Sequence, residues 1–171
     1  MNVSNKITGI IPTFNEEEHI VGAIDSLNFA DEIIVLDSFS TDTTVERAKS
    51  KGVKILQRKF DNFSSQKNFA IENASHSWIF LLDADERIST ELKKEILEVI
   101  SKSPKYNAYW IFRYNFFMKR RIKYSGWQND KVIRLFIKEK SHYNGKLVHE
   151  EIQTDGEIGY LKNKLEHYTY K

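Results

Sequence analysis

The sequence predicts an α/β fold in a single domain, with a mostly parallel sheet flanked by helices and antiparallel strands in the C-terminal third. Apolar runs of strand length alternate with segments of helical period four times in the first hundred residues. After Pro104 the chain instead offers two long aromatic and β-branched runs without a convincing helix between them. With 171 residues, of which 40% are hydrophobic, the chain can bury one substantial core, and a second domain would be cramped.

Four strand–helix pairs are expected in the first hundred residues. The strands are predicted at residues 7–14, 33–36, 53–56 and 78–82. The helices are predicted to start near residues 15, 44, 64 and 90. Asn15 with Glu18, and Thr43 with Glu46, have the spacing of capping boxes, which favours helix starts at those positions. The later runs at residues 108–117 and 131–138 are the predicted antiparallel strands.

The composition excludes several classes of protein. Lys and Arg total 26 against 24 Asp and Glu, so the net charge of +2 favours neither a nucleic-acid binder nor an acidic partner. The absence of cysteine excludes disulfides and thiolate zinc sites and fits a reducing compartment. The first residues lead straight into an apolar strand, so no signal peptide is expected, and no apolar window has the length of a membrane span. We therefore expect a cytoplasmic protein, soluble or peripheral to a membrane.

An acidic cluster follows directly on the fourth predicted strand, in the stretch FLLDADER. Asp83 and Asp85, two residues apart at an extended strand end, can project in the same direction. Carboxylate oxygens are the ligands that Mg²⁺ and Mn²⁺ prefer, so the pair is a candidate metal site. On its own the motif is weak evidence, because solvated acidic loops before a helix look the same.

The loops that follow the predicted strands are where a ligand is expected, since open α/β sheets bind ligands beyond the carboxyl ends of their parallel strands. These loops read PTFNEE, DSFSTD and DADE, and they are rich in acidic and hydroxyl side chains. Neither G-x-G-x-x-G nor G-x-x-x-x-G-K-[ST] occurs in the sequence. A nucleotide bound here would need another way of holding its phosphates, which a metal ion on Asp83 and Asp85 could supply.

Four segments, in this order, resemble glycosyltransferase family 2 with the GT-A fold. They are PTFNEE after the first strand, VLDSFSTDTT after the second, QKNFA at the start of a helix and LLDADE after the fourth strand. The later segments GWQNDKVIRLF and GKLVHEE are similar to the subgroup of WaaE-type lipopolysaccharide core β-glucosyltransferases. The resemblance implies one GT-A (Rossmann-like) domain over residues 1–171, with a nucleotide-sugar-binding half at residues 1–103 and an acceptor-side half at residues 104–171.

For the donor side, the resemblance implies inverting, metal-dependent transfer of a hexose from a nucleotide sugar such as UDP-glucose. Phe14 would stack on the uracil base, and Asp37 would accept a hydrogen bond from it; from the residues alone, core packing of Phe14 and capping by Asp37 stay open. Lys67 would contact the base or diphosphate, Asp83 the ribose, and Asp85 the Mg²⁺ or Mn²⁺ ion. The implied donor and metal residues are Pro12, Thr13, Phe14, Asn15, Glu16, Asp37, Lys67, Asp83, Ala84 and Asp85.

For the acceptor side, the resemblance implies a general base in the segment GKLVHEE. In an inverting reaction, a carboxylate removes the proton of the attacking acceptor hydroxyl. Glu150 is the predicted base, and Glu151 is the second candidate. His149 is predicted to orient the acceptor or a phosphate, and Trp127 to form a platform for the acceptor. From the residues alone, an exposed turn and a packing tryptophan stay open.

The expected acceptor is a saccharide or lipid-linked saccharide of cell-envelope polysaccharide or lipopolysaccharide biosynthesis, at the inner face of a bacterial plasma membrane. The basic stretch FFMKRRIK can touch anionic lipid or a phosphorylated acceptor, or it can be a solvated hairpin. Relatives generally continue past the equivalent of LEHYTY, so the domain is expected to lack the family's C-terminal extension.

Three other classes of protein share parts of this pattern. A haloacid-dehalogenase-type phosphotransferase would carry its nucleophile on the first strand, and a nucleotidyltransferase would bring a glycine-rich, basic first loop instead of PTFNEE. A non-catalytic sugar-nucleotide-binding or protein-interaction module on the same fold stays open as the alternative. Product formation from a UDP-sugar would exclude it.

Overall fold

The structure is a computed structural model that describes residues 4–117, 120–122, 129–145 and 151–168. Its first part contains β1 (Ile7–Thr13), α1 (Ile20–Ser26), β2 (Glu32–Asp37), α2 (Thr44–Ser50), β3 (Lys54–Gln57), α3 (Phe63–Glu72), β4 (Trp78–Leu81), β5 (Glu86–Arg87) and α4 (Thr90–Ser101). Its second part contains β6 (Ala108–Phe117), β7 (Arg120–Arg121), β8 (Lys131–Ile137), the 3-10 turn η2 (Lys138–Lys140), β9 (Ser141–Tyr143), β10 (Ile152–Thr154), β11 (Gly159–Tyr160) and β12 (Leu165–Tyr168).

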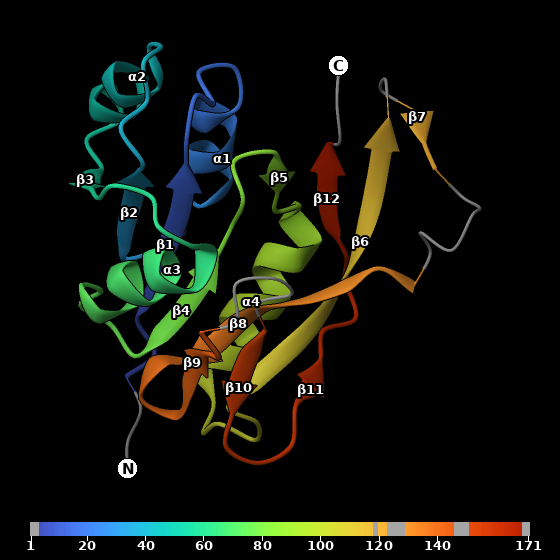
Figure 1. The fold of residues 1–171 in the computed structure, drawn as a ribbon. Coiled ribbons are helices and arrows are strands. Elements are labelled where there is room, and N and C mark those ends of the chain that lie inside the picture. Colours follow the sequence, from blue (N-terminus) through green and yellow to red (C-terminus); the bar gives the residue numbers. More distant parts are fainter. Residues whose placement is uncertain (1–3, 118–119, 123–128, 146–150, 169–171) are drawn as a thin grey trace.

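One large sheet runs through the molecule in the order β3-β2-β1-β4-β8-β6-β12-β5 (Figure 1). Strands β1 to β4 pair in parallel, as the four strand–helix repeats predict. Thr13 at the end of β1 is in register with Asp37 at the end of β2, and Ile10 of β1 with Leu81 of β4. The carboxyl ends of these strands, and the loops that follow them, therefore lie at the same edge of the sheet.

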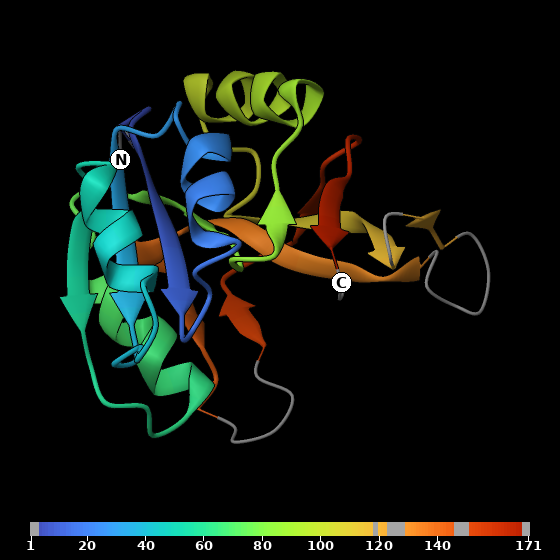
Figure 2. The same ribbon diagram turned by 90° about the horizontal axis from the view of Figure 1, so that it is seen from above.

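Alternate residues of the central strands face two separate cores, one on each side of the sheet. Ile7 and Ile11 pack in the core that also contains α1 and α4, whereas Ile10 packs in the core that contains α3. Figure 2 shows α1 and α4 on one side of the sheet and α3 on the other. Gly9 lies close to α1, because a Cβ at this position would stand 2.9 Å from Cδ1 of Leu27. Glycine at residue 9 thus lets the end of α1 lie directly on β1.

The C-terminal third completes the sheet with antiparallel strands, as predicted. β8 lies between β4 and β6 and runs antiparallel to both, and β9 and β10 form a separate antiparallel pair. The short strands β11 and β12 differ from the prediction, because they pair in parallel with β6. β12 also pairs with β5, so that His167 is in register with Glu86. This pairing brings the end of the described chain to the acidic cluster that follows β4.

Side-chain caps mark the starts of α3 and α4, whereas α1 and α2 have none. Ser89 precedes α4 and its hydroxyl accepts a hydrogen bond from the N–H of Leu92 at 3.2 Å, and Asn62 caps α3 in the same way. The predicted capping box of Asn15 and Glu18 is wrong, because α1 begins only at Ile20. Asn15 has a φ of 52° and belongs to a loop instead. No helix within the described ranges has both the length and the apolar character needed to span a membrane.

Candidate active site

A first cleft of about 660 Å³ lies at the edge where β1, β2 and β4 end. It is the place where an open α/β sheet is expected to bind a ligand. Phe14 is 56% exposed in it although the side chain is large and apolar. The lining residues are Pro12, Thr13, Phe14, Glu16, Ser38, Phe60, Phe63, Gln66, Lys67, Asp83, Ala84, Asp85 and His167.

Most of the residues predicted to hold a nucleotide sugar line this first cleft. Asn15 and Asp37 do not, although Ser38, the neighbour of Asp37, does. The structure thus brings the three strand-end loops together around one cleft, although they are distant from one another in the sequence. The first-cleft residues that were predicted are Pro12, Thr13, Phe14, Glu16, Lys67, Asp83, Ala84 and Asp85. Three acceptor-side residues lie outside the described residues, namely Trp127, His149 and Glu150.

Asn15 ties the loop after β1 to the loop after β2, and Asp37 ties the loop after β2 to β3. The side-chain oxygen of Asn15 accepts a hydrogen bond from the N–H of Thr41 at 2.8 Å. The fully buried Asp37 carboxylate accepts hydrogen bonds from the Ser40 hydroxyl at 2.5 Å and from Gln57 Nε2 at 3.0 Å. Asp37 therefore caps its own loop, the simpler of the two roles considered, and a contact between Asp37 and a base stays a prediction.

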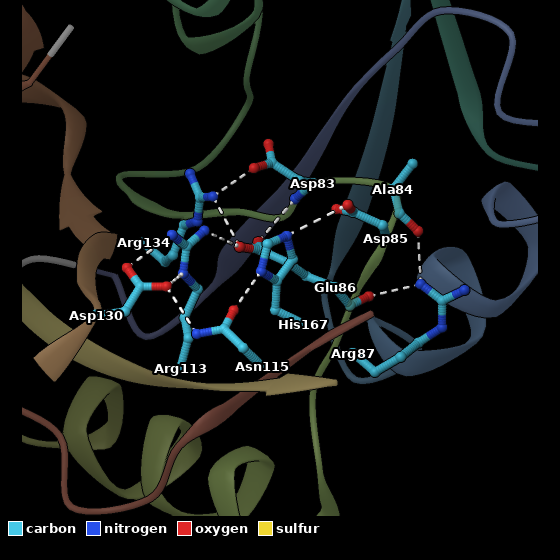
Figure 3. Close-up of polar contacts among 10 residues, drawn as sticks. All are labelled: Asp83, Ala84, Asp85, Glu86, Arg87, Arg113, Asn115, Asp130, Arg134 and His167. Atoms are coloured by element: carbon cyan, nitrogen blue, oxygen red, sulfur yellow. Dashed lines mark hydrogen bonds and ion pairs between the residues drawn. The ribbon is translucent and has the colours of Figure 1, made fainter. Parts of the chain in front are cut away.

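Asp83 and Asp85 both face the first cleft, but they have different neighbours (Figure 3). Asp83 Oδ2 accepts a hydrogen bond from Arg134 Nη2 at 2.5 Å. Asp85 Oδ2 lies 3.3 Å from Nε2 of His167. Burial alone would raise the pKa of Asp83, but the positive charges of Arg134, Lys67 and Arg113 together outweigh burial and lower the pKa. Asp83 is therefore ionised at neutral pH.

A buried ionic network lies behind the two aspartates. Glu86, which has no exposed surface, accepts hydrogen bonds from Arg134 Nη2 at 2.9 Å and from Arg113 Nη1 at 3.3 Å. Arg113 also forms a two-bonded pair with Asp130, at 2.9 and 2.8 Å. Burial alone would lower the pKa of Arg134, but the neighbouring carboxylates raise it well above its ordinary value. The third carboxylate of the DADE stretch thus holds Arg134, which contacts Asp83, and Arg113, which contacts Asp130.

The network continues to Asp85 through an amide and an imidazole. Asn115 Nδ2 donates to Asp130 at 3.0 Å, which turns its Oδ1 toward Nδ1 of His167 at 2.6 Å. Because an amide oxygen can only accept, His167 Nδ1 carries the proton, and in a neutral imidazole Nε2 presents a lone pair to the Asp85 carboxylate. Two acceptors that face each other need either a second proton or a bound cation between them.

The residues of the first cleft fit a divalent cation. Burial raises the pKa of Glu16, His19 opposes the rise, and the negative charges of Asp85, Asp42 and Asp83 add to it. Carboxylates suit Mg²⁺ and Mn²⁺, and an imidazole whose other nitrogen is hydrogen-bonded is a common metal ligand. Among the described residues, no three His, Cys, Asp or Glu side chains already form a group that could hold a metal ion. Asp85 and His167 are the two that face each other.

A second cleft of about 440 Å³ adjoins the first, and Lys67 and Asp83 line both. Glu151, the second candidate for the general base, lines this second cleft. The remaining lining residues come from β6, β8 and the β9–β10 pair, and they are Trp110, Arg113, Lys131, Val132, Ile133, Arg134, Tyr143 and Ile152.

Sequence reasoning missed Arg134 and His167. Arg134 stands within the apolar run KVIRLFI, and a charged residue in a strand that reads as buried is a signal that a buried partner exists. His167 carried no comparable signal, because it reaches the site only through the pairing of β12 with β5.

The profile of glycosyl transferase family 2 matches residues 8–169. The chain belongs to this family. An uncharacterized glycosyltransferase of Rickettsia typhi is 33% identical over 167 residues, which are 91% of this chain and 56% of that protein. The lipopolysaccharide core biosynthesis glycosyltransferase LpsC of Rhizobium meliloti is 27% identical over 159 residues, 90% of this chain and 59% of LpsC. This family 2 domain therefore spans somewhat more than half the length of these relatives.

Solved structures show that the family 2 domain has the GT-A fold. TarS of S. aureus, residues 1–349 in complex with UDP, aligns with a TM-score of 0.67 at 16% identity, over 97% of this chain and 60% of the TarS chain. Glucosyl-3-phosphoglycerate synthase of Mycobacterium tuberculosis, in complex with Mn²⁺, UDP and phosphoglyceric acid, aligns with a TM-score of 0.51 at 22% identity. That alignment covers 66% of this chain and 43% of the synthase chain.

Proposed function

We propose that this family 2 glycosyltransferase is an inverting, metal-dependent enzyme that transfers a hexose from a UDP-sugar, such as UDP-glucose, to a saccharide or lipid-linked saccharide. The observation that carries the proposal is the meeting of Asp83, Asp85 and Phe14 in the first cleft. An exposed aromatic ring and a pair of carboxylates that line one strand-end cleft suit a ligand that combines a planar base with a charged diphosphate. The UDP in two structures of the same fold, and the Mn²⁺ in one of them, support the donor and the cation.

In this proposal different residues of the first cleft bind different parts of the donor. Phe14 stacks on the uracil, and Lys67, which is only 8% exposed, places its ammonium group near the diphosphate. Asp83, fixed by Arg134, accepts hydrogen bonds from the ribose. Asp85 and His167 would hold the divalent cation, which when bound offsets the negative charge of the departing UDP.

The acceptor is proposed to enter through the second cleft. Its hydroxyl attacks the anomeric carbon opposite to the UDP leaving group, and Glu150 removes the hydroxyl proton, with Glu151 as the second candidate. His149 would orient the acceptor, and Trp127 would provide an apolar platform for a sugar ring. The name of LpsC supports an acceptor from lipopolysaccharide biosynthesis. A lipid-linked acceptor would bring the exposed Arg120 and Arg121 of β7 to the anionic inner face of a bacterial plasma membrane.

Asp85→Asn is expected to abolish the gain in UDP affinity that Mn²⁺ gives the unchanged protein. The substitution removes one anionic ligand but keeps the size of the side chain. The affinity for the ion should therefore fall, whereas the stability of the sheet should change little. The measurement is calorimetric titration of UDP with and without Mn²⁺, together with the unfolding midpoint to show that the fold survives. Asp155→Asn is the matched control, because Asp155 is exposed and lies outside both clefts. Equal Mn²⁺-assisted binding of UDP by Asp85→Asn and the unchanged protein would refute the assignment.

A further inference from the structure

Arg87 joins two walls of the first cleft. Its Nη1 donates to the carbonyl oxygens of Ala84 and Glu86, each at 2.6 Å, and its Nη2 donates to that of His19 at 2.9 Å. Ala84 belongs to the DADE loop (residues 83–86), and His19 immediately precedes α1. Phe14 lies in the segment between β1 and α1. One side chain therefore connects the wall that carries the exposed ring to the wall that carries the carboxylates.

The DADE loop is held through the carbonyl oxygens of its backbone. The N–H groups of Glu86 and Tyr168 donate to the carbonyls of the two aspartates on either side of Ala84, each at 2.9 Å. Arg87 supplies the donor for the Ala84 carbonyl itself. Figure 3 shows Arg87 and Arg134 on opposite sides of this loop. Arg134 contacts a side chain of the loop, whereas Arg87 fixes the backbone from which both aspartates project.

A glycine in α1 leaves room for the guanidinium of Arg87. A Cβ at Gly22 would stand 2.6 Å from Nη2, 2.7 Å from Nε and 2.9 Å from Cζ of Arg87. Apart from proline, glycine is the least favourable residue inside a helix, so its presence on the face that Arg87 contacts has a steric reason. Because the guanidinium is the end of a flexible side chain, a larger residue at position 22 would displace it from the His19 carbonyl.

We propose that Arg87 is a positioning residue of the donor site, which fixes the backbone of the DADE loop against α1 so that Asp85 faces His167. The inference rests on the proposed function, because it takes Asp85 as a ligand of the divalent cation. Within the part of the chain that the structure describes, no carboxylate forms an ion pair with Arg87. Its charge-assisted hydrogen bonds all hold backbone carbonyls instead.

The test compares Arg87→Met with Gly22→Ala, which keeps the arginine but displaces its guanidinium. Both variants are expected to weaken Mn²⁺-dependent binding of UDP roughly 10- to 100-fold, the usual effect of losing a group that orients a metal ligand. The affinity for UDP without Mn²⁺ should stay nearly unchanged, whereas a general loss of the fold would lower both affinities. Arg47→Met is the matched control, since Arg47 also donates to a carbonyl before α1, that of Glu17 at 3.1 Å, but lines neither cleft.

A second measurement needs neither metal nor nucleotide. Amide hydrogen exchange, followed by NMR, reports whether the N–H groups of Glu86 and Tyr168 stay bonded to the DADE loop. In Arg87→Met and in Gly22→Ala, both amides are expected to exchange roughly tenfold faster, because the loop opens more easily. The double variant should be no worse than Arg87→Met alone, because the two substitutions break the same contact. In Arg47→Met, the exchange should match that of the unchanged protein.

The outcomes separate this inference from the proposed function. If Mn²⁺ strengthens UDP binding by Arg87→Met as much as by the unchanged protein, the inference is wrong and the donor proposal stands. An equal loss of UDP affinity with and without Mn²⁺ would also overturn it, because Arg87 would then support the fold as a whole. If the unchanged protein does not bind UDP but both amides exchange faster in both variants, Arg87 positions the DADE loop and the donor proposal fails. Unchanged exchange of both amides overturns the inference whatever the result with UDP.

Discussion

Replacing Glu150 by glutamine is expected to lower the turnover of sugar transfer by roughly 10² to 10⁴-fold, the range of a positioned general base. Glutamine keeps the size and hydrogen bonding of the side chain but cannot take the proton of the acceptor hydroxyl. The affinity for the UDP-sugar should stay nearly unchanged, because donor residues lie in the first cleft. The measurement is the steady-state rate of UDP release from UDP-glucose in the presence of acceptor saccharide, with calorimetry for donor affinity.

Glu151→Gln is measured beside it, because Glu151 lines the second cleft and Glu150 lies outside the described residues. Glu157→Gln is the control, an exposed glutamate that lines neither cleft. If Glu150→Gln keeps near-normal turnover and Glu151→Gln loses it, the general base is Glu151 and not Glu150. Full turnover in both variants would show that the base lies elsewhere in the chain.

Arg134→Leu is expected to cost about 3–5 kcal/mol of the free energy of unfolding, the usual effect of removing one partner from a buried ion pair. Arg134 is 5% exposed and contacts both Asp83 and Glu86, and Glu86 has no exposed surface. Leucine would leave the Glu86 carboxylate with one cation, Arg113 at 3.3 Å, and with the hydrogen bond from the N–H of Asp83 at 3.0 Å. The measurement is urea unfolding followed by circular dichroism, with a check that the m-value is unchanged.

A control is Lys102→Leu, which removes the exposed ion pair with Glu98 and is expected to change stability little. Arg134→Lys keeps the charge but not the planar fork, so its free energy of unfolding should lie between that of Arg134→Leu and that of the unchanged protein. A loss of stability for Arg134→Leu as small as that for Lys102→Leu would mean that the buried network does not hold the DADE loop in place.

The order of strands and helices in the first hundred residues was predictable because each element has its own local period. Strand β4 and the carboxylates that follow it stand in one short stretch, so the position of Asp83 and Asp85 at the mouth of a parallel sheet follows from the sequence. The predicted start of helix α1 lies too early in the chain, because asparagine is a common helix cap. Asn15 instead adopts a left-handed backbone conformation and accepts a hydrogen bond from the loop after β2. Short-range patterns cannot distinguish these two uses of the same side chain.

The network behind the site could not be predicted, since its members meet only through the pairing of distant strands. Asp83 and Arg134 are 51 residues apart, and Asn115 and His167 are 52 apart. β12 has only four residues and no clear alternation, so nothing local shows that it lies between β6 and β5. Arg134 at least signals itself as a charge within an apolar strand, whereas His167 does not.

The central claim, that the first cleft binds a UDP-sugar, is tested most directly by the unfolding midpoint of the protein with UDP-, GDP- and CDP-sugars in the presence and absence of Mn²⁺. A ligand that binds only the folded state raises the midpoint. We predict the largest rise for UDP-glucose with Mn²⁺, and a much smaller rise in Phe14→Ala, because stacking on a base contributes about 1–3 kcal/mol. Phe39→Ala, which removes an equally exposed ring outside the first cleft, should behave like the unchanged protein. No rise with any UDP-sugar, or an equal rise in Phe14→Ala, would contradict the account.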